Sequence, residues 1–125
     1  MLKLTTIFFL IGALVLAVLH GIAETLSLYW YYWWFDLPMH LFGGAIVALG
    51  WFTLHDLGLW VRTEHLRLLS IWLLSLVVML LWEVFKLYAG KEIDEDFVLD
   101  TVLDLTMGSL GSLIGFYVAK QLRTL

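Results

Sequence analysis

The sequence predicts an all-α fold: a polytopic membrane protein forming a four-transmembrane-helix bundle in a single domain, residues 1–125. Of the 125 residues, 62% are hydrophobic and 14% charged, whereas soluble domains hold about 45–50% apolar and about 25% charged residues. The mean hydropathy of +0.95 agrees with this composition. The apolar residues also gather into four runs of about 18–23 residues, each long enough to cross a hydrocarbon core of about 30 Å. The expected spans cover about residues 4–23, 37–54, 67–89 and 97–119.

The first span has a signal peptide as its alternative, because Gly21-Ile22-Ala23 is similar to a small-residue cleavage site. Its apolar run of about 17–20 residues is longer than the hydrophobic region of a signal peptide, so we expect a membrane span. Residues 29–35, which follow it, are all Tyr, Trp or Phe. Such residues concentrate where bilayer meets water, which predicts an interfacial segment. An aromatic ligand clamp is the alternative for this run.

The ends of the other spans carry local signals. Asp36 is expected to cap the second span, with Pro38 in its first turn, where a missing N–H has no cost. Gly90 is expected just beyond the third span, and a solvated acidic loop is expected at residues 91–96. The second and fourth spans are rich in small residues, including Gly111-x-x-x-Gly115, which predict close helix packing.

Lys and Arg are distributed unevenly between the two ends of the predicted bundle. The end with the two termini holds Lys3, Arg62, Arg67, Lys120 and Arg123, whereas Lys86 and Lys91 lie near the other. Because Lys and Arg are enriched in cytoplasmic loops, we expect both termini to be cytoplasmic and the aromatic run to face outward. The absence of Cys excludes disulfides, Fe–S clusters and thiolate metal sites. No basic patch for nucleic acid is present, and no organic cofactor is expected.

Each span carries ionisable residues near its outward end. These are His20 and Glu24 in the first span, Asp36 and His40 in the second, Glu83 in the third, and Asp100 and Asp104 in the fourth. At about 1.5 Å per residue, His20 and Glu83 lie about 24 Å from the inner start of their helices, while His40 and Asp104 lie about 5 and 10 Å below the outer start. All four depths fall in the outer third of a core of about 30 Å.

The spacing of these residues is a second coincidence. His20 and Glu24, Asp36 and His40, and Asp100 and Asp104 are each four positions apart, so the two residues of each pair share a helix face. We expect the three faces to converge, with Glu83, on one polar cavity that opens outward. Ionisable groups inside membrane helices usually face a bundle interior or a water-filled site. Lys86 is expected to pair with one of the acids, and His20 and Glu24 are further polar candidates at this site.

Carboxylates with an imidazole predict a divalent cation, Mg, Ca, Mn or Zn. The candidate metal ligands are Asp36, His40, Glu83, Asp100 and Asp104. The favoured function is metal-assisted hydrolysis of a lipid-linked or cell-envelope substrate, with His40 or Glu83 as the catalytic group that moves the proton. The lipid bilayer and such a substrate are the expected partners, and a homo-oligomer is compatible with the sequence.

Two other functions remain open from the sequence. The polar residues can form a network that fixes helix packing in a non-enzymatic membrane scaffold, with Lys86 neutralising the acids. They can also belong to an ion or proton pathway, which requires polar groups that continue inward. Spans two to four offer few such groups, chiefly Thr53, Ser70 and Ser75, so the pathway ranks third.

The chain resembles the small bacterial inner-membrane proteins typified by YjdF, and more distantly the VanZ-like proteins. The resemblance covers residues 36–115 and is carried by Asp36-Leu-Pro-Met-His40 with Gly43-Gly44, by Trp82-Glu83, and by Asp100-Thr101-Val102-Leu103-Asp104. It implies a multi-pass protein of the bacterial cytoplasmic membrane and groups Asp36, His40, Glu83, Asp100 and Asp104, but it names no reaction. Lys86 stands where that family often has a second Glu, which weakens a two-metal interpretation.

Overall fold

A computed structural model describes residues 2–89 and 97–125 and confirms the predicted all-α bundle. Its four long helices are α1 (Leu4–Thr25), α3 (Asp36–Asp56), α4 (Leu68–Tyr88) and α5 (Phe97–Leu122). All four are long and apolar enough to cross a membrane. Two short elements were not anticipated: the single-turn helix α2 (Leu28–Tyr31) within the aromatic run, and the 3-10 helix η1 (Thr63–Leu66) between α3 and α4.

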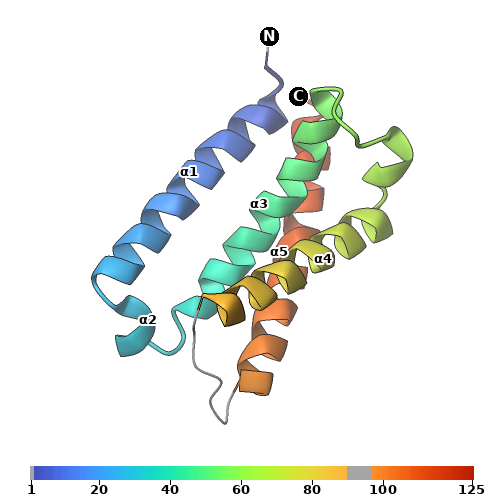
Figure 1. Cartoon of the computed structure of the whole chain (residues 1–125). Helices are drawn as coiled ribbons and strands as arrows, with labels where there is room; N and C mark the ends of the chain where they lie inside the picture. Colours follow the sequence, from blue (N-terminus) through green and yellow to red (C-terminus); the bar gives the residue numbers. More distant parts are fainter. Residues whose placement is uncertain (1, 90–96) are drawn as a thin grey trace.

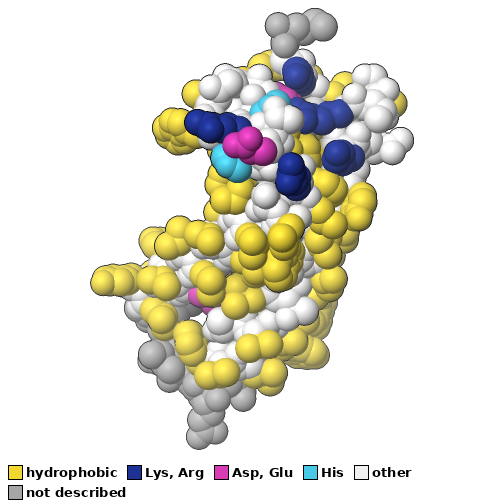
Figure 2. Space-filling model, turned by 90° about the vertical axis from the view of Figure 1, so that its right-hand side faces the viewer, with side chains coloured by type: hydrophobic (Ala, Val, Ile, Leu, Met, Phe, Trp, Pro, Cys, Tyr) yellow, Lys and Arg dark blue, Asp and Glu magenta, His cyan; other side chains and the backbone are white. Residues whose placement is uncertain are grey.

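The helices α3 and α5 form the centre of the bundle (Figure 1). Helix α1 packs on α3, while α4 crosses α3 and α5 obliquely and contacts both. Both chain termini lie at one end of the bundle, here called the terminal end, and α2 lies at the opposite end, the α2 end. Basic side chains gather at the terminal end above a broad hydrophobic surface, as Figure 2 shows.

Small residues bring the backbones of α3 and α5 into direct contact along a seam. A Cβ atom added to Gly44 would overlap the carbonyl oxygen of Gly108, and one added to Gly111 would overlap the carbonyl oxygen of Leu41. Only residues without a side chain allow this approach, which is how membrane helices gain packing where lipid offers no hydrophobic driving force. The small residues that predicted close packing therefore lie at the helix crossing.

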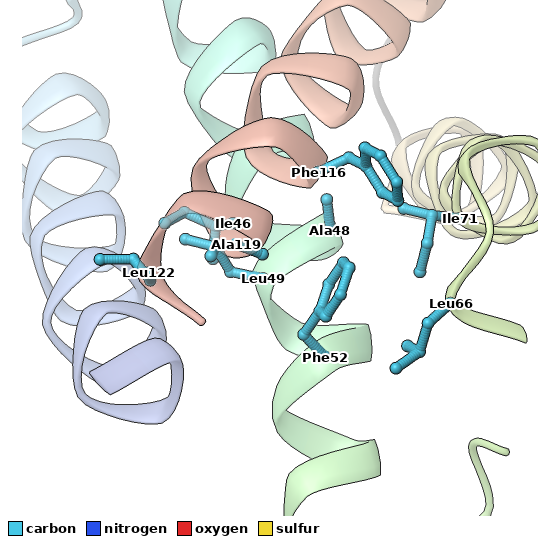
Figure 3. Packing of buried hydrophobic residues seen from close by; sticks show 9 residues of the cluster. All are labelled: Ile46, Ala48, Leu49, Phe52, Leu66, Ile71, Phe116, Ala119 and Leu122. Atoms are coloured by element: carbon cyan, nitrogen blue, oxygen red, sulfur yellow. The ribbon is translucent and has the colours of Figure 1, made fainter. Parts of the chain in front are cut away.

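The buried hydrophobic core lies beside this seam (Figure 3). It comprises Ile46, Ala48, Leu49, Phe52, Leu66, Ile71, Phe116, Ala119 and Leu122. The outward faces of α1 and α4 instead expose many large apolar side chains, which suits contact with lipid. The core and the seam together fix α3 against α5 and so set the frame on which polar groups converge at the α2 end.

Of the expectations about helix ends, the one for Asp36 is wrong and those for residues 90–96 lie outside the described residues. Asp36 does not cap α3: the helix begins at Asp36 itself, Phe35 takes the capping position, and no side chain of the described residues forms a capping hydrogen bond there. The physical reason is that the Asp36 carboxylate lies against the ring of His40, one turn further along the helix. The expectations for Gly90 and for the loop at residues 91–96 lie outside the described residues.

Candidate metal centre

Three helices deliver ionisable side chains to one place at the α2 end. Helix α3 contributes Asp36 and His40, which are one turn apart; α4 contributes Glu83 and Lys86; and α5 contributes Asp104. These five residues are called the site cluster below. They meet because the α3–α5 seam begins one turn beyond His40 and Asp104, at Gly44 and Gly108, and holds the two helices together there.

His40 occupies the centre of the site cluster. Its Nδ1–H donates a hydrogen bond of 2.9 Å to the backbone carbonyl of Asp36. The same nitrogen lies 3.2 Å from Asp36 Oδ1 and 3.5 Å from Asp104 Oδ1. On the other side of the ring, Nε2 lies 3.6 Å from Glu83 Oε1. One imidazole therefore faces carboxylates from all three helices.

Lys86 joins the acids of α4 and α5. Its Nζ lies 3.0 Å from Glu83 Oε2 and donates a hydrogen bond of 3.1 Å to Asp104 Oδ2. The structure thus confirms that Lys86 pairs with an acid, and shows that it pairs with two. Because this pairing uses Oδ2 of Asp104, the other oxygen of that carboxylate is left facing His40.

The site cluster is buried, so its charges depend on one another. The side chain of Asp104 is 1% exposed, and that of Lys86 is 12% exposed. Buried charges are tolerated where they are paired and hydrogen-bonded. Yet Asp104 Oδ1 and His40 Nε2 are buried and make no hydrogen bond to any described residue. Such atoms mark positions where a bound ion or an additional proton would be favourable.

Asp36, His40 and Asp104 satisfy the geometric requirement for a metal site. Each offers one ligand atom, and these atoms all lie within 4.8 Å of one another. Ligands about 2.0–2.1 Å from a tetrahedral ion are about 3.3 Å apart. The separations of Nδ1 from the two carboxylate oxygens, 3.2 and 3.5 Å, match that value. The donor set of two carboxylates and one imidazole suits Zn or Mn and, through its oxygens, Mg.

The other sequence-predicted residues lie around this group. Asp100 is exposed on α5, one turn before Asp104, and no hydrogen bond or ion pair joins it to another described residue. His20 and Glu24 lie 3.9 Å apart at the end of α1, both substantially exposed. Glu83 is buried but stands outside the three-residue group, with Oε1 facing His40 Nε2.

A cavity of about 380 Å³ lies beside the site cluster, between α1, α3 and α4. Its polar lining is His20, Tyr29, Asp36, His40 and Lys86, and the remaining lining residues are apolar or Gly. Tyr29, which the sequence placed only in an interfacial segment, is hydrogen-bonded through its hydroxyl to His20 Nδ1 at 2.9 Å. Burial and the nearby carboxylates of Asp36 and Glu24 raise the pKa of Tyr29 to about 12, so its hydroxyl stays protonated.

A second polar cluster lies at the terminal end, where the sequence indicated only interfacial residues. The Asp56 side chain is 1% exposed and is surrounded by bases. Its Oδ1 lies 3.4 Å from Lys3 Nζ and 3.4 Å from His55 Nδ1, and it also pairs with the Arg123 guanidinium. Asp56, Lys3, His55 and Arg123 are called the terminal cluster below. Lys3 and Arg123 lie far from Asp56 in the sequence, so no local signal indicated that they pair with it.

Comparison of the chain with protein-family models, with curated proteins and with solved structures finds no match.

Proposed function

We propose that the site cluster binds a divalent cation through Asp36, His40 and Asp104. The observation that carries this proposal is the buried, unbonded Oδ1 of Asp104, which lies within a group whose three ligand atoms have metal-site separations. Balance of charge supports it: three acids contact two basic side chains, so the cluster has a surplus of negative charge. A cation relieves that surplus where water cannot.

His40 sets a condition on binding. Its Nδ1–H donates to the Asp36 carbonyl, so this proton must leave before Nδ1 can bind a metal. Metal affinity should therefore fall as the pH is lowered. Glu83 lies on the opposite edge of the ring, where a carboxylate orients a metal-ligating histidine and raises its basicity. This placement favours Glu83 as a partner of His40 over a role as a fourth ligand.

The chemistry that we propose for the site is hydrolysis of a lipid-linked or cell-envelope substrate. A divalent cation, when bound, supplies Lewis acidity and lowers the pKa of water. Glu83 is the group that would accept and return the proton. His40 would take this role only if it were not a metal ligand, because an imidazole that binds a metal through Nδ1 keeps its proton on Nε2. Lys86 also lines the adjacent cavity, but its ammonium group is already paired with Glu83 and Asp104.

We further propose that the α2 end faces the exterior of a bacterial cytoplasmic membrane. Support comes from the basic residues at the terminal end, which are enriched on the cytoplasmic side of membrane proteins. A relationship to the YjdF-like proteins is part of this proposal, supported by the Asp36-x-x-x-His40 and Asp100-Thr101-x-x-Asp104 elements.

A non-enzymatic scaffold is the second candidate, and the position of Lys86 favours it. Lys86 joins α4 to α5, and His40 faces acids of α4 and α5 from α3, so the cluster itself ties three helices together. In this alternative Lys86 already supplies the compensating cation, and no metal is needed. The two candidates differ in whether the folded protein carries a metal and gains stability from it.

Elemental analysis of the full chain, purified in detergent without chelator, tests the proposal. We expect a stoichiometric divalent metal that is lost in His40→Ala and in Asp104→Asn. Reloading the stripped wild type should stabilise it by about 2.7 kcal/mol when the metal is at a hundred times its Kd. Glu24→Gln is the matched control, because this acid lies at the same end but is exposed. It should keep the metal.

Absence of metal from the wild type, with no stabilisation by Mg, Ca, Mn or Zn, would overturn the proposal. If Asp104→Asn then also misfolded, the scaffold would be favoured, since removal of one partner from a buried network destabilises it. Asp100→Asn refines the ligand set: retention of metal there would limit the site to three protein ligands, and loss would add Asp100.

A further inference from the structure

The terminal end of the bundle carries a surplus of positive charge. Five bases and two acids stand at this end of the described chain. The bases are Lys3, Arg62, Arg67, Lys120 and Arg123, and the acids are Asp56 and Glu64. Asp56 pairs with Lys3 and Arg123, and Glu64 lies 3.8 Å from Arg62. The surplus therefore remains after both acids are paired, which is the opposite of the charge balance in the site cluster.

Two of these bases, Arg67 and Lys120, have no acidic partner among the described residues, and both are exposed. Lys120 Nζ lies 5.6 Å from the centroid of the Phe116 ring, one turn before it on α5. Arg67 lies one turn before Ile71, whose N–H donates a hydrogen bond of 2.9 Å to the Arg67 carbonyl. Because Phe116 and Ile71 belong to the same hydrophobic core (Figure 3), the two unpaired bases lie one turn beyond a shared region of that core.

The loop at residues 57–61 adds apolar side chains to this charged end. Leu57, Leu59 and Trp60 are exposed there, and Trp60 is the most exposed of them at 91%. The loop follows α3 directly, and the 21 residues of that helix span about 30 Å, the thickness of a hydrocarbon core. The loop therefore lies at the level where lipid chains meet headgroups, and Trp side chains concentrate at that depth.

We propose that the terminal end binds anionic phospholipids of the adjacent leaflet, with their headgroups at Arg67 and Lys120 and the ring of Trp60 at the boundary between headgroups and chains. Charge complementarity selects this partner, because unpaired Lys and Arg side chains form charge-assisted hydrogen bonds with phosphate oxygens. A zwitterionic lipid carries an ammonium group of its own and does not neutralise the surplus. The inference goes beyond the proposed metal site, since no residue of the site cluster takes part in it.

Titration of the delipidated full chain in detergent with phosphatidylglycerol and with phosphatidylcholine of the same acyl chains, followed by native mass spectrometry, tests the inference. Phosphatidylglycerol should bind about tenfold more tightly. This preference should weaken as the ionic strength is raised, because salt screens exposed charges.

Substitution of the unpaired bases should remove the preference. Arg67→Gln and Lys120→Gln should each lower the affinity for phosphatidylglycerol about fivefold and leave that for phosphatidylcholine nearly unchanged. Neither change leaves a described acid without its partner, so thermal unfolding should match the wild type. Arg67→Lys is the matched control, because it retains the charge and should retain the preference.

Two further variants separate charge from apolar contact. Glu64→Gln removes one of the two acids of this end, an exposed one, and should raise the affinity for phosphatidylglycerol. Trp60→Ser leaves the charge unaltered and should weaken the binding of both lipids by a similar factor.

Equal affinity of the wild type for the two lipids would overturn the inference. So would a preference that survives in the Arg67→Gln/Lys120→Gln double variant, because the lipid would then bind elsewhere. Binding of polyglutamate at these bases, together with equal affinity for the two lipids, would assign the surface to an acidic protein partner instead. The double variant should keep its metal, so the metal proposal and this one can fail separately.

Discussion

The two polar clusters at opposite ends of the bundle are built on opposite balances of charge. In the terminal cluster one acid, Asp56, is surrounded by Lys3, His55 and Arg123. In the site cluster three acids surround Lys86 and His40. Exposure differs as well: the Lys3 side chain is 62% exposed, whereas that of Lys86 is 12% exposed.

This difference separates a cluster that joins helix ends from the candidate functional site. The bases of the terminal cluster reach water, so each can be solvated if its pairing is lost. In the site cluster the side chains of Glu83 and Asp104 are 7% and 1% exposed, so a surplus of negative charge on them has to be relieved by a proton or a cation. Charge balance combined with burial, more than the presence of ionisable residues, is what makes the site cluster the candidate for a role beyond packing.

The largest expected loss of stability comes from replacing Lys86, the buried base of the site cluster. Lys86→Met leaves Glu83 and Asp104 facing each other without their shared cation and should lower the free energy of unfolding by about 3–5 kcal/mol. Lys3→Met, the corresponding change in the terminal cluster, should cost about 1 kcal/mol or less because that base is exposed. Thermal unfolding in detergent with EDTA measures both. Equal losses would remove the distinction between the clusters.

Stability should depend nearly as strongly on the seam between α3 and α5. Gly44→Ala places a methyl group against the carbonyl of Gly108, which is backbone and cannot rotate away, so we expect a loss of about 3 kcal/mol. Gly43→Ala is the matched control, since its new methyl group would meet only Leu16 Cδ2 at 3.9 Å. The same unfolding assay compares them. If Gly44→Ala left the free energy of unfolding unchanged, this contact would not be what holds the clusters in place.

A substitution of Glu83 that keeps the shape of its side chain should lower metal affinity more than it lowers the free energy of unfolding. Glu83→Gln retains the volume and removes the charge beside His40 Nε2, and loss of such a partner typically reduces metal affinity about 10–100-fold. Competition with a chromophoric chelator measures the change. An unaltered affinity would assign Glu83 to the ion pair with Lys86 alone.

The smallest loss of stability is expected for a change in the terminal cluster itself. Asp56→Asn removes the charge attraction to bases that are in part solvated, so we expect a cost of about 1 kcal/mol. This cost should shrink when the ionic strength is raised, because salt screens such pairs. Urea or thermal unfolding at low and high salt provides the measurement. A metal content altered by this variant would contradict the separation of the two clusters.

Sequence reasoning succeeded where a local pattern reports a physical requirement. The length and apolarity of four runs predicted the bundle, and the four-residue spacing of Asp36 and His40 placed both on one helix face. It did not find what depends on the angles between helices. The sequence predicted a polar cavity, whereas the cavity of the structure has a mainly apolar lining and includes, of the five predicted ligands, only Asp36 and His40. The contact of Tyr29 with His20 depends on the turn between α1 and α2, which leaves no periodic signal. The pairing of Asp56 with Lys3 and Arg123 joins segments more than fifty residues apart.

The contact between α3 and α5 also has a consequence for ion size. His40 and Asp104 each lie one turn from a glycine of the seam, so main-chain contact, and not flexible side chains, sets the distance between them. A frame of this kind has little freedom to widen. Mg holds its ligands at about 2.0–2.1 Å and Ca at about 2.3–2.6 Å, and selection between them depends on the size and flexibility of the site. If the site cluster binds a divalent cation as proposed, the seam should make it select by radius and bind small divalent ions in preference to Ca.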